Sequence, residues 1–289
     1  HITDRHEKIA SSLMMVSCLS RLTKKIKLGT LTSNLNFYKP AIMASLIALA
    51  DNLTKGRLIL GIGSGTNRSD LEAINLLEND NHSLMLESYE IIKQIFNSND
   101  KVEIKSKNFK ITTLQTGNDE LGLGFFNNLY NSRKDLEIIM PALNENSYNV
   151  KVCAKNEWSI AISNFCSDEI VNNHIYSYLK YSPLDKEQAL KKIKITKLIY
   201  IHENAKQAEK CAFADDSPYM ELINILFKKL KTFNKHACFG QNINNSIDAA
   251  KKILWYGTPE KISDKIKILK QKFGNLSPII YVSVPKTTS

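Results

Sequence analysis

Two patterns of hydrophobic and polar positions alternate along the whole chain. Short, continuous apolar runs indicate buried strands, and longer stretches with apolar residues at helical spacing indicate helices. The predicted strands span residues 26–32, 58–63, 136–142, 158–163, 195–201 and 279–284. The predicted helices span residues 9–24, 40–53, 82–97, 147–155, 168–180 and 259–273, with further helical regions at 204–233 and 247–256. This alternation predicts an α/β fold in which helices cover a parallel sheet.

The segments between these elements favour a barrel over an open sheet. Residues 101–113 are expected to form a two-stranded excursion, and residues 114–135 form a long connection with no period, which is usually functional or disordered. The late excursion over residues 204–256 is more typical of a barrel insertion. Because the chain begins with His1 and not with Met, we expect an unseen segment before it, and two more strands there would complete an eight-stranded barrel. We therefore predict a single, partial barrel domain over residues 1–289.

Charge and hydropathy narrow the classes of protein further. The chain carries 39 Lys and Arg against 29 Asp and Glu, but the lysines are mixed with acidic residues on amphipathic helices, as on a solvated surface. This disfavours a nucleic-acid interface, although the net charge of +10 alone leaves it open. No apolar run reaches the roughly 18 residues that a membrane span needs, so no membrane association is predicted.

The five cysteines stand far apart and form no CxxC pair, so no metal site is predicted. A reduced, cytoplasmic protein is the simplest interpretation. Cys18 and Cys153 fall in helical patterns, where we expect them to be buried packing residues.

The predicted strand at 58–63 runs into a glycine-rich turn that has two interpretations. Gly61 and Gly63 fit the start of a dinucleotide-binding fingerprint, but the third glycine, Gly65, comes one residue early, and no acidic residue follows at the end of a next strand. Glycines at the end of a barrel strand would let a flat ring or a phosphate approach the backbone. The alternative is a tight turn that binds nothing. The S-x-x-E spacing of Ser69 and Glu72 then predicts a helix that starts at Ser69.

The flanks of this turn carry a resemblance to a known family. The residues that carry it are, in order, Ile26-Lys27-Leu28-Gly29-Thr30, Pro40, Asp51, Thr54-Lys55-Gly56-Arg57 and Gly61-Ile62-Gly63-Ser64-Gly65, with His1 to Ile9 before them and Trp255 to Ile262 near the other end. In these stretches the chain resembles the bacterial-luciferase-like flavin-dependent monooxygenases, and in particular their limonene-monooxygenase-like branch. The resemblance spans nearly the whole chain.

The resemblance implies a (β/α)8 TIM barrel whose first two strands lie upstream of His1. It also implies an oxidoreductase that uses reduced FMN and O2 to oxygenate a small hydrophobic substrate, with FMNH2 delivered by a separate NAD(P)H-dependent flavin reductase. Residues 114–135 could act as a lid over the substrate. A homo-oligomer is expected. Two alternatives stay open on the same barrel: a deazaflavin (F420)-dependent oxidoreductase, and a degenerate flavin-binding paralogue without catalysis.

The resemblance also assigns roles to residues by motif position. His1 matches the active-site histidine, a residue type suited to acid–base work near neutral pH. Asn144 to Ser147 match a phosphate-binding turn at a helix N-terminus, for which a ligand-free N-cap is the competing account. The full set expected at the cofactor is Thr30, Leu31, Thr32, Ser64, Gly65, Asn144, Ser147 and Asn164.

Overall fold

The computed structural model describes residues 1–289 except 8, 233–235, 241, 277–279 and 283–289. The chain divides into two compact units, His1–Met140 and Pro141–Ser289, and each is described by itself. The expectation of one domain over residues 1–289 stays a prediction.

The first unit is built around one buried strand. Its strands are β1 (Leu28–Gly29), β2 (Ser33–Asn34), β3 (Leu58–Gly63) and the start of β6 (Glu137–Ala142), and β3 pairs in parallel with each of the other three. The predicted strand at 26–32 is therefore interrupted: pairing with β3 stops near Thr30 and resumes at Ser33. Leu60 and Ile62 of β3 are fully buried, as expected of a central parallel strand.

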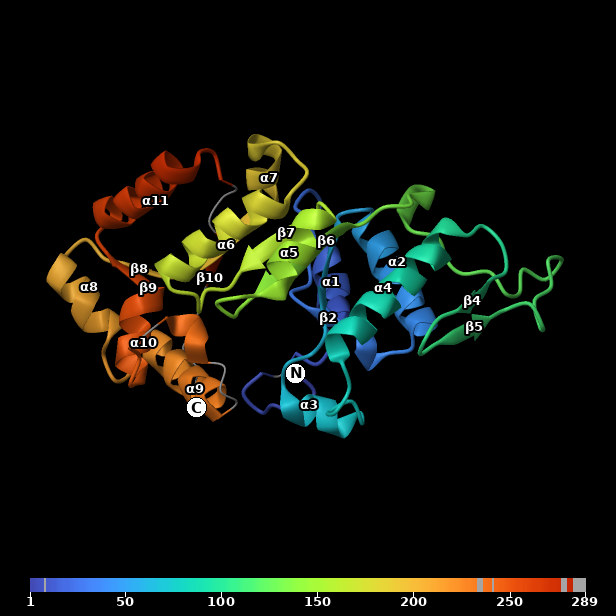
Figure 1. Ribbon diagram of the computed structural model, residues 1–289, viewed down its shortest axis with the longest axis horizontal. Coiled ribbons are helices and arrows are strands. Elements are labelled where there is room, and N and C mark those ends of the chain that lie inside the picture. Colours follow the sequence, from blue (N-terminus) through green and yellow to red (C-terminus); the bar gives the residue numbers. More distant parts are fainter. Residues whose placement is uncertain (8, 233–235, 241, 277–279, 283–289) are drawn as a thin grey trace. The chain divides into compact units, whose positions relative to one another are not determined.

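Four helices and a hairpin complete the first unit. They are α1 (Ser12–Ser20), α2 (Pro40–Thr54), α3 (Arg68–Ala73), α4 (Asn81–Asn97) and the antiparallel pair β4 (Glu103–Lys105) and β5 (Lys110–Thr112), with 3-10 turns η1 (Leu35–Phe37) and η2 (Tyr130–Ser132). Helix α2 packs against both α1 and α4 (Figure 1). Its buried Met43 and Ile47 contribute to the core of this unit.

Two charged residues among those that carry the family resemblance, Asp51 and Arg57, hydrogen-bond to the loops of this unit. Asp51 on α2 is fully buried and accepts hydrogen bonds from the backbone N–H of Tyr130 at 2.9 Å and from Nε of Arg133 at 3.0 Å. Arg57 donates from its guanidinium to the carbonyl oxygens of Ile26 at 2.6 Å and Ser20 at 3.2 Å. These residues hold the connections around β3 in place.

The second unit contains the end of β6 and four further strands or strand segments. They are β7 (Ser159–Ile162), β8 (Ile193–Ile201), β9 (Leu254–Gly257) and β10 (Ile280–Val282), and β8 pairs in parallel with each of the other three. Its helices are α5 (Tyr148–Lys155), α6 (Asp168–Tyr181), α7 (Lys186–Lys192), α8 (Ala205–Ala212), α9 (Pro218–Thr232), α10 (Ser246–Ile253) and α11 (Pro259–Phe273), with a 3-10 turn η3 (His236–Phe239). Helices α9 and α10 lie side by side and share a core with β8 and β9 (Figure 1).

The parallel α/β organisation is confirmed, with several corrections. The helix expected at 247–256 ends at Ile253, because Leu254–Gly257 pairs with β8 and forms β9. The helix at 9–24 spans only Ser12–Ser20. The strand expected at 279–284 lies partly outside the described residues. No helix within the described part of the chain has the length and apolar character needed to cross a bilayer.

Two local predictions were wrong. The short helix predicted after β3 is present, but it begins at Arg68 and its N-cap is Asn67, whose side chain accepts from the Ser69 N–H at 3.3 Å, so the capping box expected at Ser69 does not form. Cys18 is exposed, because it lies on the outer side of α1, whereas Cys153 is buried as predicted.

Candidate active site

In the segment that follows β1, an exposed leucine stands between two threonines whose hydroxyls are hydrogen-bonded within the protein. Thr30 is buried, and its hydroxyl both donates to the carbonyl and accepts from the N–H of Gly61, each at 2.9 Å. The hydroxyl of Thr32 donates to Oδ1 of Asn34 at 3.0 Å. Leu31 lies between them in the sequence and is 53% exposed, and the Leu31–Thr32 peptide bond is cis. Of the three residues expected under a flavin ring, Leu31 is the one whose side chain is open to a ligand.

Gly61 and Gly63 in β3, and Gly65 just after it, make room for the protein's own chain. A Cβ atom on Gly61 would overlap the carbonyl of Thr30, and one on Gly63 would overlap the Thr32 hydroxyl. Gly65 has φ of +79°, and a Cβ there would lie 2.8 Å from the ring of Phe37. The close approach that these glycines permit is therefore intramolecular. The contact of Ser64 and Gly65 with a flavin stays a prediction.

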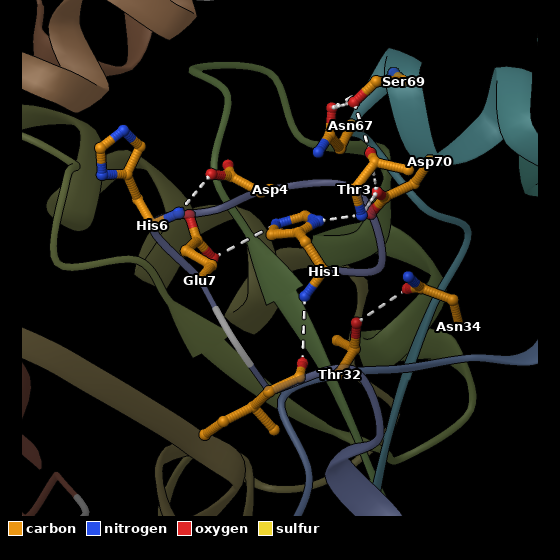
Figure 2. A network of polar contacts seen from close by, with 11 residues as sticks. His1, Thr3, Asp4, His6, Glu7, Thr32, Asn34, Asn67, Ser69 and Asp70 are labelled. Atoms are coloured by element: carbon orange, nitrogen blue, oxygen red, sulfur yellow. Dashed lines mark hydrogen bonds and ion pairs between the residues drawn. The ribbon is translucent and has the colours of Figure 1, made fainter.

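A buried carboxylate organises the N-terminal segment (Figure 2). Asp70 of α3 is 1% exposed, and its Oδ2 lies 2.6 Å from Nδ1 of His1. Its Oδ1 accepts from the N–H of Thr3 at 2.9 Å and from the Thr3 hydroxyl at 2.5 Å. The carboxylate thus fixes both the imidazole and the backbone that carries it.

The other ring nitrogen of His1 faces a second carboxylate. Nε2 lies 3.4 Å from Oε2 of Glu7, and the backbone nitrogen of His1 donates to the carbonyl of Ile9 at 3.1 Å. The side chain of Glu7 is 47% exposed and that of His1 is 29% exposed. The imidazole therefore lies between a buried carboxylate and a half-exposed one (Figure 2).

Local sequence explains why Asp70 is available for this contact. Asn67 caps α3, and Asp70 falls in the first turn, where the helix dipole favours a negative charge. The hydroxyl of Ser69 is 2.6 Å from that of Thr3, so the same turn holds the segment at a second point. Asp70 was not among the predicted site residues. The only signal for it was its position shortly after the glycine turn.

In the second unit, the turn between β6 and α5 contains Asn144 and Ser147. Both residues share one turn, since the Ser147 N–H donates to the Asn144 carbonyl at 3.1 Å. Ser147 is the N-cap residue of α5, yet its hydroxyl makes no capping hydrogen bond. Ser167, the N-cap of α6, does accept from the Ile170 N–H. The ligand-free N-cap account of Ser147 therefore lacks its expected bond.

Two buried side chains support this turn from the interior of the second unit. The thiol of Cys166 donates to the Leu143 carbonyl at 3.3 Å, and burial raises the pKa of this thiol to about 12. His174 of α6 is 2% exposed and bonds the backbone of Asn144. Burial lowers the pKa of His174 to about 4, and its Nε2 has no partner among the described residues. The imidazole is therefore neutral at pH 7.

A charged cluster that the sequence did not indicate contacts the segment after β7, in which Asn164 lies. Asn164 is half-buried in the turn after β7. Lys197 of β8 is fully buried, and its Nζ donates to Oδ1 of Asp168 at 2.7 Å and to the Cys166 carbonyl at 3.1 Å. Trp255 donates from Nε1 to the same carboxylate at 3.0 Å. Burial lowers the pKa of Lys197, and Lys197 lowers that of Asp168. The cluster joins β8, β9 and the start of α6, and its polar groups bond one another.

The predicted site residues thus fall into two groups. His1, Thr30, Leu31, Thr32, Ser64 and Gly65 lie in the first unit, and Asn144, Ser147 and Asn164 lie in the second. Within the second unit, Asn144 and Asn164 follow neighbouring strands, since the Ser163 N–H donates to the Ala142 carbonyl at 2.9 Å. Among the described residues there is no group of His, Cys, Asp and Glu side chains that could hold a metal ion.

Comparison with known proteins supports the family resemblance. Residues 1–118 match the sequence family described as luciferase-like monooxygenase. The 2,5-diketocamphane 1,2-monooxygenase 1 of Pseudomonas putida is 23% identical over 98% of this chain and 80% of its own length. The limonene 1,2-monooxygenase of Rhodococcus erythropolis is 29% identical over 89 residues, which are 31% of this chain and 23% of that protein. The predicted resemblance is confirmed.

Solved structures share the fold. The oxygenating constituent of 3,6-diketocamphane monooxygenase from Pseudomonas putida, described as a type II Baeyer–Villiger monooxygenase in complex with FMN, superposes with a TM-score of 0.81 at 15% identity, over 98% of this chain and 80% of its own. The F420-dependent tetrahydromethanopterin reductase of Methanopyrus kandleri gives a TM-score of 0.62 at 16% identity, over 95% of this chain and 82% of its own. The predicted luciferase-like α/β barrel fold is confirmed by these likenesses.

Proposed function

We propose that this luciferase-like chain is a monooxygenase that uses reduced FMN and O2 to oxygenate a small hydrophobic organic substrate. The observation that carries the proposal is the likeness, at a TM-score of 0.81 over 98% of the chain, to a monooxygenase in complex with FMN. An F420-dependent oxidoreductase is the second candidate, because the tetrahydromethanopterin reductase and an F420-dependent secondary alcohol dehydrogenase share the fold at TM-scores of 0.62 and 0.65. Fold alone does not fix the reaction.

The turn at 144–147 fits the phosphate of FMN. The hydroxyl of Ser147 makes no capping bond, and the N-terminus of α5 carries the positive end of the helix dipole. Asn144 and Ser147 would hold the phosphate there, and the buried His174 would keep the Asn144 backbone in place. Glu145 is exposed in the same turn and opposes this role through its charge.

In the first unit, the proposal assigns the ring contacts and the proton chemistry. When bound, reduced FMN supplies the two electrons that activate O2. The exposed side chain of Leu31 would pack on the ring and exclude water from it, with Thr32 and Ser64 beside it. His1 would hold and release a proton at a ring nitrogen, as imidazoles do near neutral pH. For Asn164, in the second unit, the ring contact implied by the resemblance stays a prediction.

The partners follow from this chemistry. Reduced FMN would be supplied by a separate NAD(P)H-dependent flavin reductase. Residues 114–135 would cover the substrate as a lid.

We place the protein in the cytoplasm, because its five cysteines are free, as expected in a reducing compartment.

We also propose that the chain forms a homo-oligomer through the exposed apolar side of α2, with exposed apolar residues of the neighbouring α1 contributing. The exposed apolar residues are Ile42, Leu49 and Leu53 on α2, and Met14, Met15 and Leu19 on α1. Ile42, Leu49 and Leu53 recur at helical spacing, and the face carries no charged residue of α2, since Asp51 is buried. An uncharged apolar face is typical of an interface between copies. Sedimentation velocity of Leu49→Lys should shift the protein to monomer, whereas Ile268→Lys, an exposed position on α11, should not.

Two measurements test the enzymatic proposal. Quenching of flavin fluorescence should show saturable FMN binding that Ser147→Ala weakens. Consumption of O2 should then depend on added FMNH2. No saturable FMN binding would contradict the proposal. Saturable FMN binding without FMNH2-dependent O2 consumption would favour the non-catalytic flavin-binding paralogue, and reduction of a substrate by reduced F420 without O2 would favour the second candidate.

A further inference from the structure

Asp70 and Glu7 contact the two nitrogens of one imidazole, and neither had an assigned role. Nδ1 of His1 lies 2.6 Å from Asp70 and Nε2 lies 3.4 Å from Glu7. The two carboxylates differ sharply in exposure, 1% for Asp70 and 47% for Glu7. The imidazole thus lies between a buried carboxylate and one that is nearly half exposed to solvent.

We propose that Asp70 is the positioning residue that fixes His1 through Nδ1, and that Glu7 passes protons between bulk water and Nε2. The inference rests on the proposed function only for the reaction that consumes the proton. The arrangement of the three side chains can be tested without it.

The contacts of Asp70 suit a fixed acceptor. Its Oδ1 already accepts from the N–H and the hydroxyl of Thr3, so Oδ2 is the oxygen left for His1. A buried carboxylate with these three donors has one stable orientation, because turning it would leave a buried charge without hydrogen bonds. Asp70 therefore accepts a hydrogen bond from the protonated Nδ1. This leaves Nε2 as the nitrogen that can gain or lose a proton.

The position of Glu7 suits an exchange partner. Its distance of 3.4 Å from Nε2 is longer than a settled charge-assisted hydrogen bond, and nearly half of its side chain is open to water. In the transfer, the Glu7 carboxylic acid gives its proton to the lone pair of Nε2, which leaves a Glu7 carboxylate and an imidazolium. The imidazolium gives that proton to the oxygen that gains negative charge in the oxygenation and returns to the neutral ring. Bulk water then gives a proton back to the Glu7 carboxylate, and the hydroxide that remains is taken up by the solvent. Throughout the transfer, the other ring proton stays bonded to Nδ1, which donates it in a hydrogen bond to Asp70.

The tautomer of His1 is the first test. Nitrogen NMR of the protein labelled with 15N-histidine, assigned with His1→Gln and recorded at alkaline pH, should show a protonated Nδ1 and an unprotonated Nε2. Asp70→Asn should mix the two tautomers, because the amide can donate as well as accept. A wild-type His1 with its proton on Nε2 would overturn the proposal, even if Asp70→Asn failed to fold. Unchanged nitrogen shifts in a folded Asp70→Asn would do so as well.

The second test follows the proton from solvent. Glu7→Gln should lower the FMNH2-dependent oxygenation rate about 100-fold or more, the size of the contribution of a positioned proton donor. A small carboxylic acid buffer should restore the rate in proportion to its concentration, which a merely structural loss would not allow. Glu72→Gln, an exposed carboxylate on the same helix as Asp70, is the matched control and should keep the wild-type rate.

The two tests separate the possible failures. If the tautomer is as expected but no oxygenation is seen with FMNH2, the proposed function fails and the role of Asp70 stands. If oxygenation is seen but Glu7→Gln keeps the full rate or resists rescue, the relay through Glu7 is wrong.

Discussion

The His1–Asp70 network of the first unit and the turn at 144–147 of the second differ in how their polar groups are satisfied. In the first, Asp70 is buried and accepts from His1 and from two groups of Thr3, so the network is complete without a ligand. In the second, Ser147 makes no capping bond and Nε2 of His174 has no partner among the described residues. A complete network holds a reactive group in place, whereas unused hydrogen-bonding capacity is what a ligand can take up.

Removal of the buried carboxylate should have the largest effect on stability. Asp70→Ala leaves the donors of His1 and Thr3 without their acceptor, and we expect it to lower the free energy of unfolding by about 3 kcal/mol. Urea unfolding measures this loss. Glu145→Ala, an exposed carboxylate of the other turn, should change stability by less than about 0.5 kcal/mol. A similar cost for both variants would show that the first network is no better satisfied than the second.

The neutral His174 should make stability depend on pH. Its pKa is about 4 in the folded protein against 6.5 as its ordinary value, because burial disfavours the charged ring. The unfolded chain therefore binds the proton first, so the contribution is complete above pH 6.5 and is lost as the pH falls toward 4, by about 3 kcal/mol in total. Urea midpoints across this range should fall less steeply for His174→Gln. An equal slope in both proteins would contradict the buried, neutral imidazole.

Ser147 should matter for the ligand and not for the fold. Because its hydroxyl makes no capping bond, Ser147→Ala should change the free energy of unfolding by less than about 0.5 kcal/mol, while FMN affinity falls about 10-fold or more from loss of a bond to a charged phosphate. Ser167→Ala is the matched control, since Ser167 does cap α6, and it should cost about 1 kcal/mol of stability. Equal stability losses in the two variants would mean that Ser147 is an ordinary cap.

The helices and strands were largely predictable from sequence because each has its own period. The elements around β3, α2 and α6 agree with prediction to within about one residue at each end. Residues 254–257 were predicted as helix but form a strand. A short apolar run after a helix has the same local pattern whether the helix continues or a strand begins, and only the pairing with β8 distinguishes the two.

The site was less predictable than the fold. His1 and Ser147 were found through a family resemblance, whereas Asp70 and Lys197 were missed because their partners are 69 and 29 residues away in the sequence. The glycine turn shows the same limit: Gly61 and Gly63 are required by Thr30 and Thr32, a contact that spacing along the chain does not reveal.

The smallest expected effect concerns the charge of the second turn. Glu145 is exposed beside Ser147 and would repel a phosphate, so Glu145→Gln should raise FMN affinity about two- to five-fold, the size of an exposed charge interaction. Because exposed charges are screened, the gain should shrink when the salt concentration is raised. Glu157→Gln, an exposed carboxylate in the loop after α5, should leave FMN affinity unchanged. If both substitutions raise the affinity equally, the effect reflects net charge, and the phosphate does not bind next to Glu145.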